Sequence, residues 1–200
     1  MAPQIMVTSK SAAPSADDVA EITAQIYGKD SQVSLDAAYT LTTTLLNSVG
    51  FRGLTQYGIL QEIIKAATNK KDASKRQGSM YALGAIFERF PPKCRISEVV
   101  FMMQEPGLVT CALDALADKQ SGVKEGAQYA IDALFNHLNS EGLVFGLLPV
   151  LMSYLRKATG KWQGAVMALY LIGKMADKAQ QGMESLEVCL LYTSPSPRDS

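Results

Sequence analysis

The sequence predicts an all-α fold in which about four pairs of antiparallel helices stack side by side as a solenoid. Two observations lead to this fold class. Apolar residues recur every three or four positions, and neither sustained alternation nor an Asn-Gly or Asp-Gly hairpin turn indicates strands. A segment that begins at Gly78 also recurs from Gly126, and internal repeats at this spacing are typical of stacked helical arrays.

The apolar spacing and the breakers between apolar segments predict eight helices. Met80, Leu83 and Phe87 fall on one face of a helix over 73–90, and an equivalent apolar face recurs over 126–138. The predicted helices cover 17–27, 34–49, 55–68, 73–90, 106–117, 122–138, 143–157 and 161–179.

Capping residues and breakers set the ends of these helices. Asp72 and Ser121 are suited to be N-caps. Pro106 is tolerated in a first turn because its missing N–H would have no partner there. Pro149 lies inside a predicted helix and should either kink it or mark its first turn. The breakers between the predicted helices are Gly50, Gly53, Pro91, Pro92, Gly142 and Gly160.

The internal repeat identifies the kind of array. The segments that begin at Gly78 and Gly126 share Gly, Tyr, Ala, Ala and Phe at equivalent positions, 48 residues apart. A third copy begins 38 residues later at Gly164, and a weaker first copy aligns Tyr39 with Tyr81. Such spacings are typical of HEAT or armadillo repeats of about 40–47 residues. The longer interval is attributed to an insertion over 91–105.

Equivalent positions in the copies should have equivalent packing roles. A glycine inside a helix costs about 1 kcal/mol relative to alanine. Gly78, Gly126 and Gly164 are therefore expected to allow close approach of a neighbouring helix. Tyr81 and Tyr129 are expected in the core. Trp162 is expected to pack between repeats rather than to stack on RNA.

The composition excludes several classes of protein. Hydrophobic residues make up 48% of the chain, and 19 basic residues balance 19 acidic ones, so any role in nucleic-acid binding requires a local cluster. Cys94, Cys111 and Cys189 lack zinc spacing and are expected to be reduced thiols. His137 is the single histidine, and no phosphate loop or catalytic pairing is evident. No metal, cofactor or active site is therefore expected in this fragment.

Both ends are expected to lie outside a repeat domain over 17–187. Residues 1–16 resemble neither a signal peptide nor a presequence and are expected to be a disordered tail of a cytoplasmic protein. No apolar run approaches the length of about 18 residues that a membrane span requires. The final LLYTSPSPRDS resembles a translated adapter tail, so residues 188–200 are expected to be non-native; a genuine disordered tail is the alternative.

Three segments resemble the N-terminal HEAT region of translation elongation factor 3, a fungal-type family. They are Asn-Lys-Lys-Asp-Ala-Ser-Lys-Arg at 69–76, Leu-Leu-Pro-Val-Leu at 147–151 and Gly-Lys-Trp-Gln at 160–163. The resemblance covers 55–180 and extends, less closely, to the HEAT-repeat translational activator family. Residues 91–105 depart from the pattern, and no proline-led repeat follows Lys178.

The resemblance implies a cytoplasmic, ribosome-binding ATPase built from HEAT repeats, a helical bundle and two ATP-binding cassettes, which assists release of deacylated tRNA. This fragment has no GxxxxGK[ST] sequence, so ATP is expected only in cassettes beyond it. The expected role is a monomeric, non-catalytic ribosome-binding module that contacts ribosomal RNA and proteins. A HEAT/armadillo scaffold for transport or regulation is the alternative, and a helical enzyme is a third.

The turns within the helix pairs carry a local excess of basic residues. If every repeat consists of a helix, a turn and a second helix, the turns over 69–76, 118–125 and 156–161 lie at one edge of the solenoid. These turns contain three acidic residues and have a net charge of about +6, so the edge could bind phosphate groups. Basic residues that open a helix oppose its dipole by about 0.3–1 kcal/mol, so a phosphate partner would explain them; solvated turns are the alternative. The candidate binding residues are Lys70, Lys71, Lys75, Arg76, Lys119, Lys124, Arg156, Lys157 and Lys161.

Overall fold

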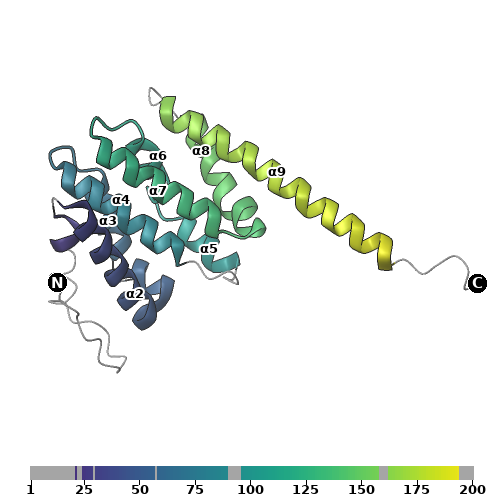
Figure 1. The fold of residues 1–200 in the computed structure, drawn as a ribbon, viewed down its shortest axis with the longest axis horizontal. Helices are drawn as coiled ribbons and strands as arrows, with labels where there is room; N and C mark the ends of the chain where they lie inside the picture. Colours follow the sequence, from purple (N-terminus) through teal and green to yellow (C-terminus); the bar gives the residue numbers. More distant parts are fainter. Residues whose placement is uncertain are drawn as a thin grey trace, which may run out of the picture.

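The computed structural model describes residue 21 and residues 24–28, 30–56, 58–89, 96–157 and 162–193. This part of the chain is helical and contains no strand, which confirms the all-α prediction (Figure 1). The elements are α2 (Ser31–Gln56), α3 (Ile59–Ala67), α4 (Ala73–Glu88), α5 (Ile96–Met103), α6 (Thr110–Ala115), α7 (Ser121–His137), the π-helix η1 (Gly142–Leu147), α8 (Leu148–Lys157) and α9 (Trp162–Thr193).

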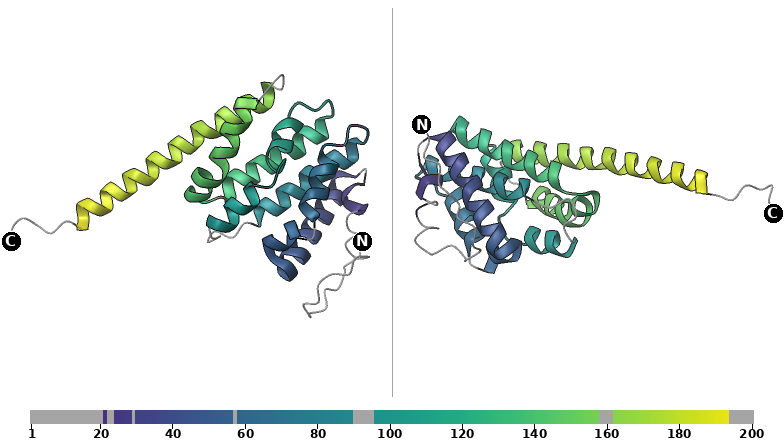
Figure 2. Two further views of the ribbon diagram at one scale, coloured as in Figure 1. Left: turned by 180° about the vertical axis from the view of Figure 1, so that it is seen from behind. Right: turned by 60° about the horizontal axis from the view of Figure 1, so that its bottom comes forward.

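The helices stack in the paired order that the repeats predicted. α4 lies between α2 and α7 and packs on both, as the ribbon shows (Figures 1 and 2). α3 packs on α4, α6 packs on α7, and α8 packs on α9, so each longer helix has a shorter partner. The arrangement is an α-solenoid, in which each unit buries its apolar face against its neighbours.

The three glycines in register allow close approach, as predicted. A Cβ atom at Gly78 would overlap the carbonyl oxygen of Ile26, and one at Gly126 would lie 2.9 Å from the Cβ atom of Met80. At Gly164 it would lie 2.7 Å from the carbonyl oxygen of Leu113. Any larger residue would therefore separate elements that now touch, which explains why these helices tolerate glycine.

Three helix predictions need correction. Residues 96–103 form α5 inside the supposed insertion; its apolar run packs on α2 and η1, with Met102 and Met103 buried. The predicted helix over 106–117 forms only as α6, after a turn in which Gly107 has a φ of 90°. The predicted helix over 143–157 divides into η1 and α8, with Pro149 in the first turn of α8, where its missing N–H is tolerated.

The predicted break at Gly50 is confirmed, because α2 consists of two helical segments that meet at a kink there. Gly50 has a φ of 65° and a ψ of −178°, which are not helical, and the second segment continues to Gln56. This is backbone geometry that an L-residue with a side chain seldom adopts.

The predictions for the termini remain untested. Residues 1–16 and most of the predicted helix over 17–27 lie outside the described residues. α9 extends to Thr193, beyond the predicted helix end at 179, and the boundary set at 188 stays a prediction. In the described part, no helix is both long and apolar enough to cross a membrane.

Candidate nucleic-acid interface at the turn edge

The turn between α3 and α4 lies at the same edge of the molecule as the turn between α6 and α7. The C-terminal end of α8 and the start of α9 also lie at this edge (Figures 1 and 2). Between the first two turns runs a groove of about 800 Å³. We call it the turn groove, and its polar lining consists of Thr68, Asn69, Lys70, Lys71, Arg76, Asp114, Asp118, Lys119 and Gln120.

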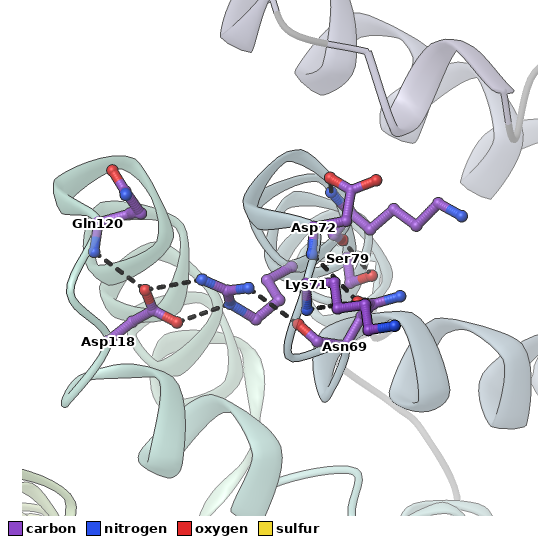
Figure 3. Close-up of polar contacts among 8 residues, drawn as sticks. Asn69, Lys71, Asp72, Ser79, Asp118 and Gln120 are labelled. Carbon is purple, nitrogen blue, oxygen red and sulfur yellow. Dashed lines mark hydrogen bonds and ion pairs between the residues drawn. The ribbon is translucent and has the colours of Figure 1, made fainter.

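An ion pair across the turn groove ties two successive repeats together. The Arg76 Nε atom donates to Asp118 Oδ2 at 2.7 Å and its Nη2 atom donates to Oδ1 at 3.1 Å (Figure 3). The Arg76 Nη1 atom also donates to the carbonyl oxygen of Asn69 at 2.8 Å. Both side chains are largely buried, with 16% and 13% of their surfaces exposed. This bidentate geometry is the strong form of an arginine–carboxylate contact.

The ion pair changes the ionisation of its carboxylate. Burial alone would raise the pKa of Asp118, but hydrogen bonds from Arg76 and from the backbone N–H of Gln120 lower it below the ordinary value of 3.8. Asp118 is therefore charged at neutral pH. The positive charge of Arg76 is largely neutralised within the chain.

Side-chain caps hold the two turns in shape. Asn69 Oδ1 accepts from the backbone N–H groups of Lys71 and Asp72, and Asp72 caps α4 by accepting from the N–H of Lys75, as predicted (Figure 3). The prediction that Ser121 is an N-cap is wrong, because Ser121 is the first residue of α7 and no side chain caps that end. Asp118 instead orders this turn through its hydrogen bond from Gln120.

The structure brings together only part of the predicted basic cluster. Lys70, Lys71 and Lys119 are exposed, line the turn groove, and form no ion pair within the described part of the chain. Arg76 also lines the groove, but Asp118 supplies the partner that an external phosphate was expected to provide. Within the chain Arg76 therefore holds the two turns together, and its role in binding a phosphate stays a prediction.

The other basic residues are spread along the edge. Lys75, Lys124, Arg156 and Lys157 are exposed, while Lys161 lies outside the described residues. Lys124 borders a separate hollow of about 410 Å³ beside Trp162. Among the described residues, Lys70, Lys71 and Lys119 come together at the turn groove.

Two expectations about aromatic residues were wrong. Trp162 is not buried between the described repeats, because 67% of its surface is exposed at the start of α9. Tyr129 is half-buried and belongs to a polar network: Tyr39 donates to Glu88 and accepts from the Tyr129 hydroxyl at 2.7 Å. Burial, together with the bond to Tyr39, raises the pKa of Tyr129 far above its ordinary value. Tyr81 is half-buried with its ring 6.3 Å from that of Tyr129.

Sequence reasoning missed a second groove, of about 890 Å³, between the α5–α6 turn and the η1–α8 segment. Its walls are mainly apolar and include Met103, Phe145 and Val150, and Tyr154 donates a hydrogen bond to Asp114 beside it. Phe145 is 61% exposed on the π-helix. The sequence signal that could have indicated this groove is Phe145, a large apolar residue next to Gly146 and shortly before Pro149.

The described residues offer little for covalent or metal chemistry. They include no group of three or more His, Cys, Asp or Glu side chains placed to hold a metal ion. Burial raises the pKa of the Cys111 thiol to about 12, so this cysteine is not a nucleophile at neutral pH. The absence of an active site from this fragment stays a prediction.

Comparisons with known proteins agree with this architecture. The family model described as EF3 N-terminal HEAT repeat matches residues 35–186. The mRNA export factor elf1 of Schizosaccharomyces pombe is 27% identical over 176 residues, which are 88% of this chain and 16% of that protein. The [NU+] prion formation protein 1 of Saccharomyces cerevisiae is 28% identical over 143 residues, 70% of this chain and 11% of that protein. The chain thus spans less than a fifth of either relative's length, and no solved structure matches it.

Proposed function

The chain belongs to the EF3 N-terminal HEAT repeat family, and on that premise we propose that it is a non-catalytic ribosome-binding module of a translation factor. The turn edge would contact phosphate groups of ribosomal RNA, with ribosomal proteins nearby. The module would act as a monomer in the cytoplasm. ATP hydrolysis would belong to cassettes outside this fragment, so the chain alone should not hydrolyse ATP.

The convergence of free lysines at the turn groove carries this proposal. Lys70 and Lys71 come from one repeat and Lys119 comes from the next, so the stacking of repeats brings together charges that are distant in sequence. The Arg76–Asp118 ion pair holds the two turns in place without using these lysines. A groove with fixed walls and exposed ammonium groups is suited to following a nucleic-acid backbone.

The experiment is cosedimentation of the chain with purified ribosomes over a range of salt concentrations. Binding through phosphates should weaken steeply with salt, with a slope that falls by about 0.7–0.9 for each phosphate contact removed. The double variant Lys71→Glu/Lys119→Glu should therefore bind more weakly and with a shallower slope. A matched control reverses two exposed cations away from the turn groove, Arg89 after the far end of α4 and Lys174 on α9.

Equal loss of binding in both double variants would point to non-specific attraction and would refute the assignment of the turn groove. Ribosome binding that neither double variant alters would also refute it. A single-stranded RNA of random sequence provides a further arm, because one relative is named an mRNA export factor. Equal affinity for this RNA and for ribosomes would favour general RNA binding over a ribosomal site.

The second candidate function is a protein–protein scaffold, which the apolar groove beside η1 favours. Phe145 is exposed at its wall, and exposed apolar patches on soluble proteins commonly mark interaction sites. A protein partner at this groove should stay bound at high salt and should be lost in Phe145→Glu. If instead the lysine variant releases the partner and Phe145→Glu does not, the assignment of the partner to this groove is wrong.

A further inference from the structure

The last helix, α9, is apolar on two opposite faces. One face is buried against α6 and α8 and includes Gly164, Ala168, Leu171 and Met175. These residues recur at intervals of three and four and so lie on one side of the helix. This burial accounts for one apolar face of α9 and leaves the other to be explained.

The opposite face carries large apolar side chains that are open to solvent. Trp162, Val166, Leu169 and Tyr170 are between 53% and 67% exposed, and their spacing of four, seven and eight residues also places them on one side of the helix. We call these four residues the α9 stripe. A surface helix normally presents polar residues on its outer side, so a second apolar face indicates a missing neighbour.

The helix α4 shows what covers such a face in this fold. From Gly78 to Phe87 it is buried almost all round because it lies between α2 and α7. In the repeat alignment set by Gly78 and Gly164, Val166 and Tyr170 of the α9 stripe occupy the positions of Met80 and Gly84. Both positions face α7: a Cβ atom at Gly84 would overlap the Tyr129 ring, and a Cβ atom at Gly126 would lie 2.9 Å from the Cβ atom of Met80.

We propose that the α9 stripe is the stacking surface for a further helix pair of the same polypeptide, which lies along α9 as α7 lies along α4. The relatives support this origin of the occupant, because this chain matches 16% and 11% of their lengths. The helix that covers the stripe must carry a small residue opposite Tyr170, because at the equivalent point of α4 the ring of Tyr129 lies over Gly84. A second copy presenting its own α7 in that register would place a tyrosine against Tyr170.

This inference does not depend on ribosome binding, and side-chain footprinting tests it separately. Hydroxyl-radical labelling followed by mass spectrometry would be applied to the 200-residue chain and to the full-length product of the same gene. Trp162 and Tyr170 should be labelled readily in the 200-residue chain and several-fold less in the full-length product. Phe101 is exposed on α5, lines neither groove, and is the internal control, because its labelling should be alike in both.

Substitutions make the test specific to the stripe. Tyr170→Glu in the full-length product should restore the labelling of Trp162, whereas Phe101→Glu should leave it protected. Equal labelling of Trp162 in both polypeptides would overturn the proposal. Protection that grows with the concentration of the 200-residue chain would overturn it in favour of self-association. Protection that appears only with ribosomes would overturn it in favour of an RNA contact.

Discussion

Replacing Gly164 by alanine is expected to destabilise the chain, whereas the same replacement at Gly173 in the same helix is expected to stabilise it. At Gly164 the new Cβ atom would lie 2.7 Å from the carbonyl oxygen of Leu113 and would overlap the Tyr154 hydroxyl. At Gly173 no atom outside the adjacent residues and the local helix backbone lies within 4 Å of that position. The two variants make the same chemical change in one helix and differ in their surroundings.

The magnitudes follow from these surroundings. Alanine gains about 1 kcal/mol over glycine inside a helix at either position. At Gly164 the clash with Leu113 involves backbone, so α9 must move away from α6, and overpacking of this kind costs about 1–3 kcal/mol. The displaced Tyr154 would also lose its hydrogen bond to Asp114, which contributes about 1 kcal/mol. Gly164→Ala should therefore lose about 1–3 kcal/mol of stability in total, and Gly173→Ala should gain about 0.5–1 kcal/mol.

Thermal unfolding followed by far-ultraviolet circular dichroism measures both variants. In a chain of this length each kcal/mol shifts the midpoint by about 2–4 °C, so the two variants should move it in opposite directions. A rise in the midpoint for Gly164→Ala similar to that for Gly173→Ala would refute the packing role of the glycines in register. The recurrence of glycine at equivalent positions of the repeats would then have no packing explanation.

Three further predictions concern the contacts between repeats. Arg76→Ala should lower the free energy of unfolding by about 2 kcal/mol because it leaves Asp118 unpaired. A double-mutant cycle with Asp118→Asn should show a coupling energy of about 1–2 kcal/mol, and additive effects would mean that the ion pair does not link the repeats. The folded state lowers the pKa of Asp118, so its stabilisation is fully present above the ordinary value of 3.8 and is lost as the pH falls through the lower folded pKa. Urea unfolding of the wild type and Asp118→Asn should thus converge below about pH 4, and a constant difference in stability would contradict the assignment. Tyr129→Phe should cost about 0.5–1.5 kcal/mol by removing the hydrogen bond to Tyr39, and an unchanged denaturation midpoint would show that this bond contributes nothing.

The local pattern of the sequence was enough to establish the helical class, the paired repeats and the positions of the close contacts. Helical periodicity depends on residues three and four apart, and a glycine shared by several copies indicates a shared packing need without identifying the neighbour. Because equivalent turns of stacked repeats lie on the same side, the repeats also predicted that the basic turns share one edge. The structure confirms this for the turns it describes.

Only the tertiary structure decided which neighbours these residues meet. It paired Arg76 with Asp118, 42 residues away, and left Lys70, Lys71 and Lys119 free at the turn groove. It also showed that Trp162, expected to be covered, is exposed. The physical reason is that burial and ion pairing depend on how one repeat sits against the next. That geometry is set by contacts between neighbouring repeats, which no local sequence pattern encodes.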